Sequence, residues 1–179
     1  GGVTWFGVNG TLTNCTFINN HANGTDGGGV RWSGVNGTLT NCTFTGNTAN
    51  RHGGAIWWSG ANGAVSKSTF TNCTTAVHGG AIWWSGANGT LTESIFINNT
   101  SNSTAGAISW RGINGSLSDS IFINNLANNA GGVFWSATNG DIIDCKFINN
   151  KGYVNGGALS LWSASNTTIT GSIFTGNIV

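Results

Sequence analysis

Few residues in this chain of 179 could do acid–base or metal chemistry: five acidic side chains, three histidines and four cysteines. Glu93, Asp119 and Asp144 each stand three residues before a phenylalanine, and Lys67 has the same place one repeat earlier. Stacked repeats would bring these carboxylates into an acidic strip, which could bind a cation or serve polysaccharide cleavage. Asparagine or glycine fills the same place in the other repeats. That mixture favours a variable, solvated column over a catalytic site.

The histidines and cysteines form no complete metal or redox site. His52 and His78 each precede a Gly-Gly pair, and two imidazoles fall short of the ligand number of a usual metal site. The cysteines contain no Cys-x-x-Cys motif, and only Cys15 and Cys42 are equivalent in neighbouring repeats. Stacked Cβ atoms would lie about 4.8 Å apart, against the roughly 3.8 Å of a disulfide. We therefore expect free thiols, no metal, no cofactor and no enzymatic activity.

Composition limits the partners and the location. Only 6% of the residues are charged and the formal net charge is +1, so no basic stripe is available to bind nucleic acid. No apolar run approaches the roughly 20 residues that span a membrane. The chain begins at Gly1, which suggests a processed chain or a piece of a longer one. Dense Asn-x-Ser/Thr sequons favour an extracellular or cell-surface location. The candidate glycosylation sites are Asn9, Asn23, Asn36, Asn88, Asn102 and Asn114.

A seven-fold repeat runs through the whole chain. The segment Gly-Gly-Ala-Ile-Trp-Trp-Ser-Gly-Ala-Asn-Gly occurs at 53–63 and again at 79–89. In every repeat an asparagine follows the tryptophan by four residues, and a phenylalanine follows that asparagine by eight. All variation in spacing falls outside the segment from tryptophan to phenylalanine, so one turn tolerates insertion. The recurring aromatic residues are Trp5, Trp32, Trp58, Trp84, Trp110, Trp135 and Trp162, with Phe17, Phe44, Phe70, Phe96, Phe122, Phe147 and Phe174.

Apolar and polar residues alternate within each repeat, which predicts short β-strands rather than helices. The positions of Ile82, Trp84, Leu91 and Phe96 are apolar or aromatic in every repeat and should face inward. Three such strands per repeat of about 26 residues predict one coil of a parallel β-helix, whose core is continuous only when coils stack. We therefore expect a single all-β domain with stacked tryptophan, phenylalanine and asparagine ladders. Its seven coils are expected at about 1–26, 27–52, 53–78, 79–104, 105–129, 130–155 and 156–179.

The repeat resembles that of known surface proteins. Gly-Gly-Ala-Ile at 53–56 and 79–82, combined with Phe-x-x-Asn, resembles the paired motifs of chlamydial polymorphic outer-membrane proteins. The Asn/Thr-rich unit is also similar to adhesin-like surface proteins of methanogenic archaea. The resemblance covers the whole chain, although Cys73 replaces asparagine in the third coil. It implies a secreted, right-handed, single-stranded β-helix with an adhesive or surface-structural role, and it fixes no ligand.

Two groups of apolar residues should face outward. Trp57 and Trp83 lie in adjacent coils, with Phe134 two coils further on. They form a candidate exposed aromatic patch for a sugar ring or another protein. The second group is a candidate lateral interface and consists of four isoleucines in adjacent coils: Ile95, Ile97, Ile121 and Ile123.

These features predict a non-enzymatic, structural or adhesive β-helix. It would be a repeat segment of a cell-surface adhesin-like protein, or a subunit that stacks end to end into an extracellular filament or sheath. Its partners would be further copies, further coils, glycans or the surface of a host or neighbouring cell, with no nucleic acid and no membrane insertion. One alternative is a polysaccharide-degrading or polysaccharide-binding fragment. Another is an ice-binding protein, because Thr-x-Thr pairs recur, although Ala64, Asp141 and Ile143 interrupt their array.

Overall fold

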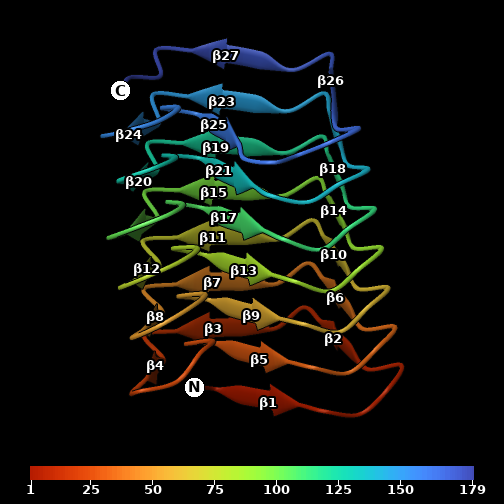
Figure 1. The fold of residues 1–179 in the computed structure, drawn as a ribbon. Coiled ribbons are helices and arrows are strands. Elements are labelled where there is room, and N and C mark those ends of the chain that lie inside the picture. The colour runs from red at the N-terminus through yellow and green to blue at the C-terminus, as the bar shows by residue number, and fades with distance from the viewer.

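Each repeat forms one coil of short strands, and every strand pairs in parallel with its equivalents in neighbouring coils. The computed structural model describes residues 1–179, and Figure 1 shows the coils piled from the N-terminus to the C-terminus. The first stack is named the Trp sheet and contains β1 (Val3–Trp5), β5 (Val30–Trp32), β9 (Ile56–Trp58), β13 (Ile82–Trp84), β17 (Ile108–Trp110), β21 (Val133–Trp135) and β25 (Leu159–Leu161). The second is named the Leu sheet and contains β2 (Thr11–Thr13), β6 (Thr38–Thr40), β10 (Ala64–Ser66), β14 (Thr90–Thr92), β18 (Ser116–Ser118), β22 (Asp141–Ile143) and β26 (Thr168–Thr170).

Two more stacks complete the solenoid. The Phe sheet contains β3 (Thr16–Ile18), β7 (Thr43–Thr45), β11 (Thr69–Thr71), β15 (Ile95–Ile97), β19 (Ile121–Ile123), β23 (Lys146–Ile148) and β27 (Ile173–Thr175). The narrow sheet contains the two-residue strands β4 (His21–Ala22), β8 (Thr48–Ala49), β12 (Thr74–Thr75), β16 (Thr100–Ser101), β20 (Leu126–Ala127) and β24 (Lys151–Gly152). The predicted parallel β-helix of seven coils is confirmed, but it has four sheets where the sequence predicts three strands per coil. Two residues are too few to show an alternating pattern, so the narrow sheet leaves no signal in the sequence.

Equivalent residues lie directly above one another. Ring centroids of successive tryptophans from Trp5 to Trp135 are 4.6 to 5.0 Å apart. Those of successive phenylalanines from Phe17 to Phe174 are 4.7 to 4.9 Å apart. These distances match the spacing between strands, about 4.8 Å, so each ring packs on the rings of the coils on either side. The expected aromatic ladders are therefore confirmed for these residues.

The prediction that Trp162 continues the tryptophan ladder is wrong. Leu161 pairs with Trp135, whereas Trp162 is 60% exposed. The last coil holds one residue more than the coil before it between Leu159 and Asn166, and Ser163 takes a left-handed conformation with φ 55° in this stretch. Aligning the last repeat on its tryptophan therefore misplaces β25 by one residue. Because a shift of one residue exchanges the two faces of a strand, Trp162 faces solvent and Leu161 takes its place in the stack.

Specific contacts and backbone angles explain the residue types in the repeated Trp-Ser-Gly-Ala-Asn-Gly segment. The Trp58 indole N–H donates to the Gly60 carbonyl oxygen at 3.0 Å. Asn62 turns the chain in a left-handed conformation with φ 54°, which asparagine tolerates well. A Cβ on Gly63 would lie 2.3 Å from Trp58 Nε1, so only glycine leaves room for the ring. The same turn recurs around Trp84 and Trp110.

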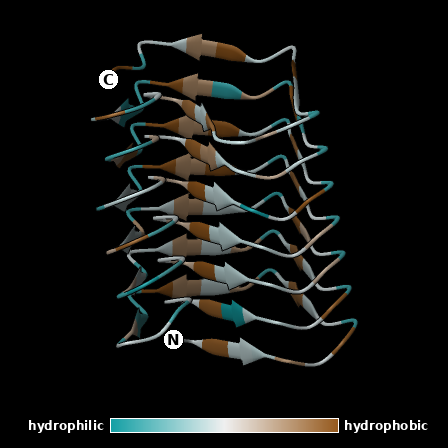
Figure 2. Cartoon of the chain, viewed as in Figure 1, coloured by the Kyte–Doolittle hydropathy of each residue, from teal (hydrophilic) through white to brown (hydrophobic).

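One continuous core fills the solenoid. A single cluster of 29 buried residues joins the Trp, Leu and Phe sheets through all the coils. Figure 2 shows hydrophobic residues mainly on the strands and hydrophilic ones mainly in the connections. No helix is long and apolar enough to cross a membrane. Each coil buries its inner face against its neighbours, so the outer faces and turns are what the molecule presents to partners.

Candidate functional site

An aromatic stripe runs along the outer face of the Trp sheet. Arg31, Trp57 and Trp83 are in register on β5, β9 and β13, and both indoles are half-buried. The two rings stack with centroids 5.4 Å apart and planes 6° apart. The Arg31 guanidinium lies over the other face of Trp57, 5.0 Å from its centroid. Both faces of Trp57 are therefore covered, so this indole presents its edge rather than an open ring face for a sugar.

Phe134 is buried and does not belong to this stripe. The prediction that it is part of an exposed aromatic patch is therefore wrong. It does lie in register with Ser109, which follows Trp83, but it is only 8% exposed. It packs with Ala105 and Ala130 in a small second cluster. These alanines stand in the turn before β17 and β21, and the small side chains let the turn lie close to the sheet and cover the ring.

Two histidines extend the stripe into the turn that precedes the Trp sheet. The rings of His52 and His78 stack at 5.0 Å, and His52 also stacks on Trp83 at 5.5 Å. Burial, followed by the charge of Arg111 and the His52 ring, lowers the pKa of His78 to about 4. Burial likewise lowers the pKa of His52. Both rings are therefore neutral at pH 7, which lets them stack without repulsion. No group of three or more histidine, cysteine or acidic residues converges here or elsewhere.

The four candidate isoleucines come together as the sequence pattern indicates. Ile95 pairs with Ile121, and Ile97 pairs with Ile123, on the outer face of β15 and β19. Ile148 continues the second column on β23, which sequence analysis did not include. All five side chains are partly exposed. We call these five residues the isoleucine strip, and its role as a lateral interface stays a prediction.

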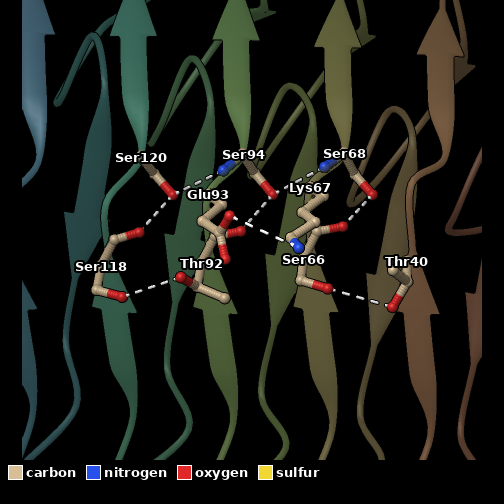
Figure 3. Close-up of polar contacts among 9 residues, drawn as sticks. All are labelled: Thr40, Ser66, Lys67, Ser68, Thr92, Glu93, Ser94, Ser118 and Ser120. Atoms are coloured by element: carbon tan, nitrogen blue, oxygen red, sulfur yellow. Dashed lines mark hydrogen bonds and ion pairs between the residues drawn. The ribbon is translucent and has the colours of Figure 1, made fainter.

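The acidic residues share one column at the turn between the Leu and Phe sheets. Lys67, Glu93, Asp119 and Asp144 all have φ values between 49° and 51°. Asparagine tolerates this left-handed conformation best, which explains why Asn14 and Asn41 occur in the same column. The Lys67 ammonium and the Glu93 carboxylate lie 3.9 Å apart with both side chains exposed, and Figure 3 shows them facing each other. Solvent screens such a pair strongly.

Hydroxyl groups line the same turn on both sides. In the core, the backbone N–H groups of Ser68 and Ser94 donate to the hydroxyl oxygens of Ser94 and Ser120 at 3.2 and 3.1 Å (Figure 3). On the outer face, the Thr40 and Ser66 hydroxyls are 3.2 Å apart, and Ser118 donates to Thr92 at 3.1 Å. The outward Thr and Ser residues are thus in register, with Ala64, Asp141 and Ile143 interrupting the array.

The cysteines are all free, as expected. The Cys15 backbone N–H donates to Cys42 Sγ at 3.4 Å. Burial raises the pKa of Cys73 and of Cys145 to about 11. These two thiols therefore stay protonated at neutral pH and act as small core side chains.

Two asparagine ladders run along the solenoid. In the outer ladder, side chains at the turn after the Trp sheet bond from coil to coil; for example, Asn36 Nδ2 donates to Asn9 Oδ1 at 3.0 Å. In the inner ladder, Asn99 Nδ2 donates at 3.0 Å to both the Phe70 carbonyl and Asn125 Oδ1. Both ladders confirm the predicted stacking. The outer ladder also contains the sequon asparagines Asn36, Asn88 and Asn114.

Comparison with known proteins agrees with this geometry. Parallel coils stacked in register define a β-solenoid repeat protein. The family described as "Right handed beta helix region" matches residues 1–174, so the chain belongs to that family. No curated protein and no solved structure matches this sequence.

Proposed function

We propose that this β-helix is a rigid extracellular rod with a structural or adhesive role. It would serve as a segment of an adhesin-like surface protein or as a subunit that stacks end to end. The observation that carries the proposal is the unbroken vertical stacking of aromatic rings through the solenoid, from Phe17 to Phe174. At about 4.8 Å per coil, seven coils make a rod roughly 34 Å long. Continuous stacks of buried rings and amides resist bending.

The isoleucine strip supports lateral contact between such rods. Ile97, Ile123 and Ile148 form one column on three adjacent strands, with Ile95 and Ile121 beside it. In the second and third coils the column of Ile97 holds Thr45 and Thr71 instead, and the first coil has Ile18. Apolar side chains clustered on one part of a mostly polar face are typical of a contact surface. A second copy of the chain, or a further part of the same surface protein, would bury the strip.

The aromatic stripe supports adhesion through protein rather than through sugar stacking. A sugar ring binds on the open face of an indole, whereas Arg31 and Trp83 cover the two faces of Trp57. Trp83 Nε1 is buried and has no hydrogen-bond partner. A carbonyl of an approaching chain could accept from this N–H once a movement of the ring exposes it. The stripe is therefore proposed as a contact for a polypeptide.

Electron microscopy and sedimentation of the purified chain test the proposal. We expect rods that associate side by side with rising concentration. The double variant Ile97→Asn, Ile123→Asn should weaken association at least tenfold, and the matched variant Thr45→Asn in the same column should not. A chain that stays monomeric and binds neither protein-coated nor cell surfaces would contradict the proposal. Release of oligosaccharides from a polysaccharide would support the enzymatic alternative instead.

A further inference from the structure

One sequon differs from all the others in its exposure. Asn23, Gly24 and Thr25 form an Asn-x-Thr triplet in which all three residues are exposed. A Cβ on Gly24 would meet no atom within 4 Å, so the middle of the triplet projects into open space. In every other sequon of the chain at least one of the three residues is partly or fully buried.

An insertion in the first coil explains this exposure. Ala22 pairs with Ala49, and the Gly27 N–H donates to the His52 carbonyl, so residues 23–26 occupy the turn that residues 50–52 occupy in the next coil. The extra residue has no equivalent to pair with. Residues 23–26 make no backbone hydrogen bond. The triplet can therefore leave the surface without breaking the ladders of the solenoid.

The side chain of Asn23 is held by its oxygen only. His21 Nε2 lies 2.7 Å from Asn23 Oδ1, and His21 Nδ1 contacts the Thr48 hydroxyl. With Nε2–H as the donor and Thr48 donating to Nδ1, the imidazole fixes the carbonyl end of the amide. Asn23 Nδ2 has no partner and is the free end.

No other candidate sequon combines three exposed residues with an asparagine Nδ2 that has no hydrogen-bond partner. Asn36 Nδ2, Asn88 Nδ2 and Asn114 Nδ2 each donate at 3.0 Å within the outer ladder. Asn9 Oδ1 accepts in the same ladder, and the Gly10 beside it is buried. For Asn102 the third residue is Thr104, which is 4% exposed and bonds to His78.

We propose that Asn23 is the residue of the folded chain that accepts an N-linked glycan. The proposal rests on the extracellular location in the proposed function. The donor is an oligosaccharide linked to a polyprenyl diphosphate, used by an oligosaccharyltransferase that reads the Asn-x-Thr triplet. The Asn23 Nδ2–C1 bond forms as the C1–O bond to the diphosphate breaks. The amide proton passes to a base of the transferase, and polyprenyl diphosphate leaves with the electron pair.

Glycosylation of the purified, folded chain in vitro tests this assignment independently of the biological location. The chain is incubated with a single-subunit oligosaccharyltransferase and a polyprenyl-diphosphate-linked oligosaccharide, and the products are mapped by intact mass and by glycopeptide mass spectrometry. We expect the mass of one glycan, at Asn23. Asn23→Gln should abolish the addition, Thr25→Ala should reduce it at least tenfold, and Thr25→Ser should retain it. Asn102→Gln is the control and should change nothing.

The urea-unfolded chain, diluted into the same reaction, shows whether the fold makes the selection. We expect it to accept glycans at several sequons, Asn36 and Asn88 among them. Equal occupancy of ladder sequons in the folded chain would overturn the proposal. So would an unmodified Asn23 in the folded chain when the unfolded chain accepts a glycan there. Either result would leave the proposed rod function untouched, because that function is tested by association and adhesion.

Discussion

At the scale of single residues, the strongest constraint is what stacks above, below and beside each side chain. Trp58 shows this, because its indole N–H bonds to the Gly60 carbonyl while Gly63 leaves space for the ring edge. Asn99 shows it for polar groups, since its amide bonds to the coils on both sides. A substitution at such a position therefore changes the stability of a whole stack rather than of one contact.

Gly63→Ala should destabilise the chain by about 1–3 kcal/mol, because the new Cβ would lie 2.3 Å from an atom of a ring that stacked neighbours hold in place. Gly7→Ala, at another place of the same turn in the first coil, is the control, since its Cβ would approach Trp5 Nε1 only to 3.5 Å, an ordinary contact. Urea denaturation of both variants measures the difference. Equal free energies of unfolding would show that the tryptophan stack yields easily, contrary to this prediction.

Cys73→Asn should stabilise the chain by about 1 kcal/mol, because it completes the inner ladder. Cys73 stands between Asn47 and Asn99, and its thiol makes only long contacts, at 3.5 Å with the Thr71 carbonyl and at 3.7 Å with the Phe44 carbonyl. An asparagine there could donate to that carbonyl and to Asn99 Oδ1, and could accept from Asn47. Cys73→Ala, which supplies none of these bonds, is the comparison in the same denaturation assay. If the two variants unfold at the same urea concentration, the ladder contributes nothing at this position.

At the scale of elements, we expect the turn before the Trp sheet to make the stability of the fold sensitive to pH. His52 and His78 stack there beside Trp83, with Arg51, Arg111 and Asp26 as the charged groups that act on them. Packing the imidazoles between coils removes water from them, which disfavours their charged forms.

The chain should lose stability as the pH falls from 6.5 to about 4. In the unfolded chain His78 titrates near its ordinary value of 6.5, whereas burial holds its folded pKa at about 4. Over this range the unfolded chain binds a proton that the folded chain does not, so acid favours unfolding. Thermal unfolding midpoints at a series of pH values measure the slope, and His78→Asn should flatten it. Asparagine suits this column, because Asn129 stands there two coils later. An unchanged slope in the variant would assign the pH dependence to other groups.

At the scale of the whole molecule, the solenoid is a sum of nearly identical coils, each of which contacts only its neighbours. Ile56, Ile82 and Ile108 are successive members of one column, so one coil can be removed between equivalent positions. Stability in such a structure depends on the number of coils and on the register of their interfaces.

Deleting residues 79–104, one complete coil, should leave a folded six-coil solenoid with lower stability. The deletion joins His78 to Ala105 and puts Ile108 directly above Ile56. Deleting only residues 79–91 should abolish folding, because it places strands of one sheet against turns of the next coil. Far-ultraviolet circular dichroism and urea denaturation distinguish the two. Loss of β-structure in the whole-coil deletion would mean that coils are not interchangeable.

The sequence by itself determines the coil and the ladders, because a period of about 26 residues and a two-residue alternation leave only stacked short strands as a way to bury every apolar column. Only the tertiary structure decides matters that depend on atoms brought together from different coils. It buries Phe134 against Ala105 and Ala130, it replaces Trp162 by Leu161 in the stack, and it adds the narrow sheet. It also separates Asn23 from the other sequons. The physical reason is that a one-residue insertion looks the same in any turn of the sequence, whereas its effect depends on whether the neighbouring coil offers it a partner.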